Sequence, residues 1–295
     1  MRFLSTQRVP RGLNRSLREG PPPCDCAAPP RQPRKQAKAV ATRRRIAWRG
    51  VLLPAVALVL WSVVAALHLV KSGLLVSPLA VLQTGWQQTA SGALARALSA
   101  SLAREASGFV IGTLGGLLLG SLLGFSRIAR RMVGPSFDTF KQISLFAWIP
   151  LISVWFGLGD AAKVVFLSLA ALLPVTAHTC DGIHAVPRSY IEVARAFRYS
   201  RLQLAVHVIL PAALPSIFTG LYLALIYSWL ATLGAEYLLV SGSGIGNLLI
   251  DGSEQFRMDL VLFGIIVVGL TGWALNALAR RAERALFARR PFGAP

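Results

Sequence analysis

The feature that most constrains this chain is a series of long apolar segments with almost no charge. A helix needs about 20 apolar residues to cross the hydrocarbon core of a bilayer. Segments of roughly this kind cover residues 51–70, 106–125, 133–156, 164–180, 214–235 and 260–279. Charged residues make up 15% of the chain, whereas soluble domains have about 25%. The sequence therefore predicts an all-α, polytopic membrane helix bundle of about six transmembrane helices.

The N-terminal segment, residues 1–49, has a different composition. It holds 13 of the 31 Lys and Arg residues but only two acids, Glu19 and Asp25. It is rich in proline and lacks apolar periodicity, so we expect a disordered basic tail, followed by a transmembrane domain at residues 50–290. The net charge of +19 would fit nucleic-acid binding, but nothing in the tail indicates a folded element. We expect the tail to lie near anionic lipid headgroups and to bind no nucleic acid.

Positive charge also predicts the orientation, because cytoplasmic loops retain Lys and Arg. With the N-terminus inside, 26 of the 31 basic residues fall on the cytoplasmic side. The others are assigned to the outer side: Lys71, Arg96, Arg104, Lys163 and Arg257. Both termini and residues 181–213 are therefore expected in the cytoplasm, and residues 236–259 outside.

The sequence indicates no enzymatic chemistry. A phosphate-binding loop of Walker type needs Gly-Lys followed by Ser or Thr, and none of the lysines follows a glycine. Cys24 and Cys26 form an isolated pair, without further Cys or His at zinc-finger spacing. We expect no catalytic residue, ATPase site, metal or cofactor in this chain, and a polytopic membrane enzyme is the least favoured class.

A transporter driven by an ion gradient is the alternative function. Such a protein would place acids or histidines in the middle of the membrane and often contains an internal repeat. No repeat is visible, and the ionisable residues near the spans are interpreted as lying at helix ends: Glu105, Asp138, His178, Asp181, Glu236 and Asp259. Neither criterion for this alternative is therefore met.

The segment 106–125 carries glycines at intervals of four residues. They are Gly108, Gly112, Gly116, Gly120 and Gly124. This spacing places them on one stripe of a helix, where the missing side chains allow a second helix to approach closely. We interpret the stripe as a helix-packing surface and not as a substrate path.

A long, less apolar segment separates the fourth and fifth expected spans. In it Ile191, Ala194 and Phe197 recur at helical spacing, which predicts a short amphipathic helix. An exposed helix under a membrane bundle is a natural docking element for a soluble partner.

Two motifs here resemble a known family. Glu192-Val193-Ala194 and, further on, Val208-x-Leu210-Pro211 are similar to the EAA loop of ABC importer permeases, whose pattern is E-A-A, three residues, G, nine residues, I-x-L-P. Residues 155–159, 181–192, 210–217 and 242–246 resemble the nitrate/sulfonate/taurine branch of that superfamily. The resemblance covers residues 50–285.

The resemblance implies a type I ABC importer permease in a bacterial inner membrane. Its partners would be an ABC ATPase subunit, a second permease copy in a homodimer, and an extracytoplasmic substrate-binding protein. The cargo would be a small oxyanion such as a sulfonate, taurine or nitrate, or else another small organic solute such as a vitamin precursor. The residues implied in coupling to the ATPase are Glu192, Val193, Ala194, Arg198, Leu210 and Pro211, with Ala194 packed against the ATPase.

The chain departs from the family pattern at two places. Arg198 stands where the pattern has glycine, and Lys141-Gln142-Ile143-Ser144 stands where the family usually has Arg-x-Ile-Pro. A left-handed bend costs a residue with a side chain about 1–2 kcal/mol. We therefore expect either a right-handed backbone at Arg198 or a compensating contact of its side chain.

Overall fold

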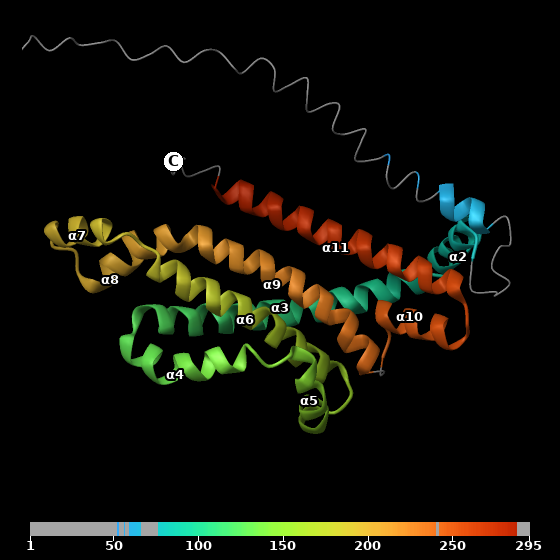
Figure 1. Cartoon of the computed structure of the whole chain (residues 1–295), viewed down its shortest axis with the longest axis horizontal. Coiled ribbons are helices and arrows are strands. Elements are labelled where there is room, and N and C mark those ends of the chain that lie inside the picture. The colour runs from blue at the N-terminus through green and yellow to red at the C-terminus, as the bar shows by residue number, and fades with distance from the viewer. Residues whose placement is uncertain (1–51, 53–55, 57–58, 66–75, 240–241, 288–295) are drawn as a thin grey trace, which may run out of the picture. The chain divides into compact units, whose positions relative to one another are not determined.

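The computed structural model describes residues 76–239 and 242–287, together with residues 52, 56 and 59–65. The expected tail, residues 1–49, lies outside the described residues, as does most of the expected first span, 51–70. Every regular element in the described part is helical (Figure 1).

Serine residues set the limits of the first helices. Helix α2 (Pro78–Ala90) begins where the Ser77 hydroxyl accepts a hydrogen bond from the Ala80 N–H at 3.3 Å. Helix α3 (Ala93–Phe125) has 33 residues and ends at Ser126, whose extended backbone stops the helix. The Ser126 hydroxyl then accepts from the Ala129 N–H and begins α4 (Arg127–Phe140). The predicted span 106–125 is thus the second part of a longer helix.

The predicted third span, 133–156, is wrong as a single helix. Helix α4 ends at Phe140, and a 3₁₀ turn η1 (Leu145–Trp148) leads into α5 (Ile149–Phe156). The two arms, Arg127–Phe140 and Leu145–Phe156, are bent by 96° relative to each other. The rings of Phe140 and Trp148 lie 4.8 Å apart across the break, so aromatic packing stabilises the bend.

The remaining elements complete the bundle. They are α6 (Asp160–His184), α7 (Arg188–Ala196), α8 (Arg201–Leu204), the π-helical segment η2 (Ala205–Ile209), α9 (Leu210–Leu238), α10 (Ile245–Glu254) and α11 (Met258–Phe287). In the described residues four helical segments are long and apolar enough to cross a membrane, or five spans if the bent pair α4–α5 counts as one. The four are Ala93–Phe125, Asp160–His184, Arg201–Leu238 and Met258–Ala285.

Helix α6 lies at the centre of the bundle between α3 and α9 (Figure 1). Its Phe166 and Leu167 are fully buried. A Cβ added to Gly116 would lie 2.8 Å from the Val175 Cβ, and one added to Gly120 would lie 2.7 Å from the Thr176 carbonyl oxygen. The stripe on α3 therefore contacts the α6 backbone itself. Figure 1 places α7 and α8 at one end of these helices and α10 at the other.

Candidate functional site

Helices α7 and α8 form a short helix–turn–helix at one end of the bundle. The turn closes α7 with hydrogen bonds from the Tyr199 N–H to the Ala194 carbonyl at 3.1 Å and from the Arg198 N–H to the Arg195 carbonyl at 2.9 Å. Ser200 then begins α8 with a reciprocal capping box to Gln203. The predicted amphipathic helix is therefore present, and hydrogen bonds define the turn that joins it to α8.

Arg198 adopts the left-handed conformation, with φ of +58°. It occupies the position after the α7 C-cap, where glycine is usual. A right-handed backbone, the first of the two expected solutions, is therefore excluded. The Arg198 side chain is exposed and has no hydrogen bond or ion pair with another described residue, so the compensating contact is not within this part of the chain.

Four large apolar side chains of this helix pair are exposed. Tyr190 and Val193 are each 57% exposed, Phe197 is 74% exposed and Leu202 is 75% exposed. Ala194, in contrast, is only 5% exposed and faces its own chain. The helix pair therefore buries Ala194 within the chain, and the packing of Ala194 against the ATPase stays a prediction.

The other residues implied in coupling lie around this surface. Glu192 is exposed on α7. Leu210, 38% exposed, and Pro211 form the first turn of α9. The α7–α8 surface is defined here as Tyr190, Val193, Phe197 and Leu202. Helix α7 contacts η2, the segment that leads into α9.

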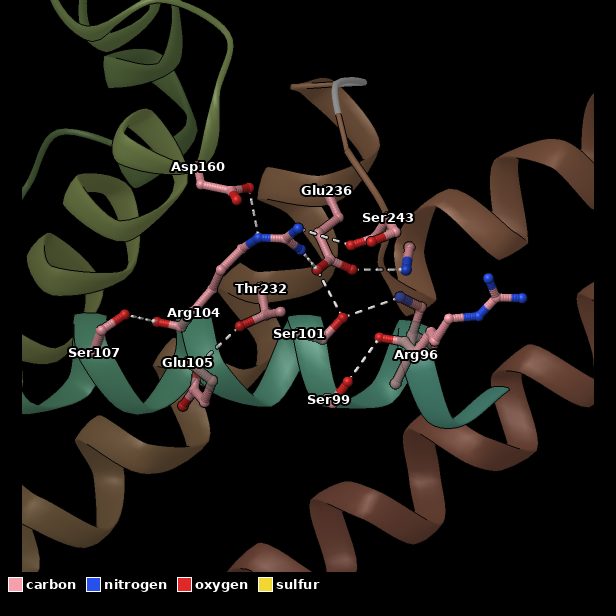
Figure 2. Close-up of polar contacts among 12 residues, drawn as sticks. Arg96, Ser99, Ser101, Arg104, Glu105, Ser107, Asp160, Thr232, Glu236 and Ser243 are labelled. Atoms are coloured by element: carbon pink, nitrogen blue, oxygen red, sulfur yellow. Dashed lines mark hydrogen bonds and ion pairs between the residues drawn. The ribbon is translucent and has the colours of Figure 1, made fainter. Parts of the chain in front are cut away.

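A second site, which is polar, lies at the opposite end of the bundle. Arg104 of α3 extends its guanidinium between three acceptors, as Figure 2 shows. Its Nε donates to Asp160 Oδ1, its Nη1 to Glu236 Oε1 and its Nη2 to the Ser243 carbonyl, each at 2.7 Å. The Arg104 side chain is 8% exposed and that of Glu236 is 1% exposed. This pair is therefore a buried ion pair with its hydrogen bonds satisfied on several sides.

The same network fixes the segment of residues 242–246, which precedes and begins α10. The Gly246 N–H donates to Glu236 Oε2 at 2.8 Å, and the Ile245 N–H donates to the Ser101 hydroxyl at 3.0 Å. A Cβ on Gly246 would lie 2.5 Å from the Glu236 Cβ, so only glycine allows this approach. Gly242 has φ of +95°, which also favours glycine.

Next to Arg104, Glu105 is buried at 2% exposure in the interior of α3. It accepts hydrogen bonds from the Ser228 hydroxyl at 2.5 Å and the Thr232 hydroxyl at 2.8 Å, both on α9. The interpretation of Glu105 as a helix-end residue is therefore wrong.

Two basic residues assigned to the outer side are also buried in the protein. Arg104 is 7% exposed and Lys163, on α6, is fully buried. Neither lies in a loop. If the helix expected from the sequence had begun before residue 106, Arg104 and Glu105 would have fallen inside it. Charged residues are rarely fully buried unless they are paired, so partners on other helices would then have been expected for both.

The described residues contain no cluster of three or more His, Cys, Asp or Glu that would hold a metal ion.

Comparison with known proteins agrees with this arrangement. Residues 112–290 match the family model described as "Binding-protein-dependent transport system inner membrane component". A putative aliphatic sulfonates transport permease of Bacillus subtilis is 35% identical over 258 residues, which cover 86% of this chain and 93% of that protein. The taurine transport system permease of Escherichia coli is 32% identical over 257 residues, covering 82% and 93% respectively.

Solved structures show the same fold. A methionine ABC transporter in an inward-facing conformation matches with a TM-score of 0.57 and 22% identity, over 65% of this chain and 95% of that chain. An amino acid ABC transporter matches with a TM-score of 0.54 and 20% identity, over 64% and 92%. The all-α fold expected from the sequence, that of a type I ABC importer permease, is confirmed.

Proposed function

This chain belongs to the family of binding-protein-dependent transport system inner membrane components, of the sulfonate, taurine and nitrate type, and we propose that it is the permease of an ATP-driven importer for a small oxyanion. ATP hydrolysis is carried out by a separate ABC ATPase subunit. The permease itself performs no covalent chemistry and alternates between two conformations that its partners bias.

The observation that carries this proposal is the exposed α7–α8 surface. Four large apolar side chains are exposed on a helix pair whose turn is closed by hydrogen bonds, and Glu192 and Arg198 of the same pair are exposed as well. An amphipathic helix with its apolar face free is suited to a groove on a soluble partner. The EAA-like pattern occurs on the same helix, so the ATPase is the partner proposed for this surface.

The helix that follows provides a mechanical link. Residues Arg201–Leu238 form one helical unit of 38 residues, about 57 Å long at 1.5 Å per residue. It starts at the α7–α8 surface and ends just beyond Glu236, which holds residues 242–246. A movement of α8 imposed by the ATPase is therefore transmitted to the opposite end of the bundle.

The other partners follow from the family and from the exposed surfaces. On α5, Val154 is 81% exposed and Trp155 is 67% exposed, which suits contact with a second permease copy or with lipid. We place both termini and α7–α8 in the cytoplasm of a bacterial cell and α10 outside, next to the substrate-binding protein. The glycine stripe on α3 serves helix packing.

Copurification with the ATPase tests the proposal. Val193→Asp and Phe197→Asp would each bury an unpaired carboxylate in the interface, which costs several kcal/mol, so we expect both variants to insert normally but lose the ATPase and substrate uptake. Gln255→Asp introduces the same charge at the exposed end of α10, far from the α7–α8 surface, and is expected to leave copurification of the ATPase unchanged. Normal ATPase binding by Val193→Asp and Phe197→Asp would refute the assignment of this surface.

A further inference from the structure

The break between α4 and α5 opens a cavity of about 710 Å³. One wall is the segment that joins the two arms, residues 141–146, and the others are α6 and α9. The lining residues of α6 fall within 170–177, near the middle of that helix, and those of α9 fall within 227–231, in the second half of that helix. The cavity therefore lies beside the spans and not beyond their ends, a position suited to a molecule that crosses the membrane.

The polar groups of this cavity are concentrated on one wall. Lys141, Gln142 and Ser144 follow one another along the break, and Tyr227 adds a phenol from α9. Lys141 is the only charged residue among the lining residues. Its ammonium, the Gln142 amide and the two hydroxyls can all donate hydrogen bonds, so this wall matches an oxyanion.

The remaining walls are apolar. They are formed by Ile143, Leu145, Phe146, Ala170, Leu173, Pro174, Ala177, Leu230 and Ala231. A nitrate or bicarbonate ion has no apolar part to cover these side chains, whereas the hydrocarbon chain of an alkanesulfonate would displace water from them. The cavity thus combines one anionic subsite with a hydrophobic one.

The charge of Lys141 is accessible to such a ligand. Its Nζ lies 2.7 Å from Asp138 Oδ1, but the two side chains are 41% and 65% exposed. Ion pairs at this exposure contribute little, so an incoming sulfonate can compete for the ammonium. Ser144 stands where the family pattern has proline, and its hydroxyl adds a donor that proline lacks.

We propose that this cavity binds linear alkanesulfonates during transport, with the sulfonate at Lys141, Gln142 and Ser144 and the alkyl chain against Leu173 and Leu230. The proposal rests on the proposed function as an oxyanion importer and narrows its substrate class. It assigns preference for an alkyl chain to the permease itself, in addition to whatever selection the substrate-binding protein makes.

Protection of a cysteine tests the site directly. Ala177→Cys is introduced after the three natural cysteines are replaced by serine, and the permease–ATPase complex is placed in nanodiscs without the substrate-binding protein. The rate of maleimide labelling is then measured against the concentration of ethane-, propane- or butanesulfonate. We expect labelling to slow, with the half-protecting concentration falling about fourfold for each added methylene.

Variants of the polar wall decide which residues carry the effect. Lys141→Gln is expected to raise the half-protecting concentration of butanesulfonate by about tenfold or more, because a charge-assisted hydrogen bond is lost. Ser144→Ala should also raise the half-protecting concentration of butanesulfonate. Arg96→Gln serves as control, because Arg96 is an exposed residue of α3 outside this cavity, and it should leave the half-protecting concentration unchanged.

Three results would overturn the proposal: no protection by any alkanesulfonate, equal protection by sodium nitrate at matched ionic strength, or unchanged protection in both Lys141→Gln and Ser144→Ala. Copurification of the ATPase is scored on the same samples. Loss of the ATPase counts against the proposed function, and labelling of the permease alone still decides whether the cavity binds sulfonates.

Discussion

Replacing Glu236 by Gln tests whether the buried ion pair with Arg104 holds residues 242–246 in place. Glutamine keeps the shape of the side chain but removes the charge that faces Arg104 at 2.7 Å. Breaking a buried pair by removing one partner costs about 3–5 kcal/mol. Arg104 retains the Asp160 carboxylate, which is 66% exposed, and the Ser243 carbonyl, so we expect the lower limit, about 3 kcal/mol.

The assay compares unfolding free energies in detergent micelles, together with the alkylation rate of Ser243→Cys. Ser243 is exposed, and its alkylation should accelerate when the segment is released. Arg257→Gln removes the Arg257–Asp259 pair, in which Arg257 is 44% exposed, and should cost less than about 1 kcal/mol. If Glu236→Gln is no more destabilising than Arg257→Gln and alkylation is unchanged, the network does not hold the segment.

Three further predictions address the other elements. Arg198→Gly should stabilise the protein by about 1 kcal/mol in thermal unfolding, because glycine adopts positive φ without strain. If this variant instead loses ATPase binding in a salt-dependent manner, Arg198 contacts the ATPase. Gly120→Leu should prevent assembly, since its side chain would overlap the α6 backbone at Thr176, and normal yield on size exclusion would contradict this. An impermeant thiol reagent should label Ser243→Cys in intact cells but not Arg201→Cys, and the reverse pattern would invert the proposed topology.

The sequence predicted the helices that are continuous and apolar, because their lengths follow from the thickness of the bilayer. It could not predict that α3 begins at Ala93, since Arg96, Arg104 and Glu105 made its first part too polar for a lipid-facing span. Arg104 and Glu105 are tolerated because α9, α6 and the 242–246 segment supply partners, which are far away in sequence, whereas Arg96 is exposed. The bend between α4 and α5 was missed for a similar reason: its aromatic packing and the cavity beside it depend on tertiary contacts.

The α7–α8 helix pair shows both the power and the limit of a short motif. Its pattern located the helix, but periodicity alone did not show which face is free. Phe197 was grouped with Ile191 and Ala194 on one apolar face, whereas Ala194 is buried and Phe197 is exposed. The difference arises because Phe197 follows Tyr190 and Val193 at helical spacing and so shares their exposed side of α7, whereas Ala194 faces its own chain.

The buried acids also change the argument about ion coupling. The sequence argument against a gradient-driven transporter assumes that no acid lies in mid-helix, but Glu105 is such an acid. Family membership, and not this criterion, therefore distinguishes an ATP-driven importer from a gradient-driven transporter.

One face of α3 carries Ser101, Arg104 and Glu105. These residues contact Ser228, Thr232 and Glu236 of α9, which recur every four residues. The same face continues as the glycine stripe against α6. Helix α3 therefore has a single buried stripe with two functions: its glycines fix it to α6 by close packing, and its polar residues fix it to α9 by hydrogen bonds. Because polar contacts can exchange partners while close-packed glycines cannot, a movement of α9 relative to the α3–α6 pair would be accommodated at the Glu236 end of the bundle.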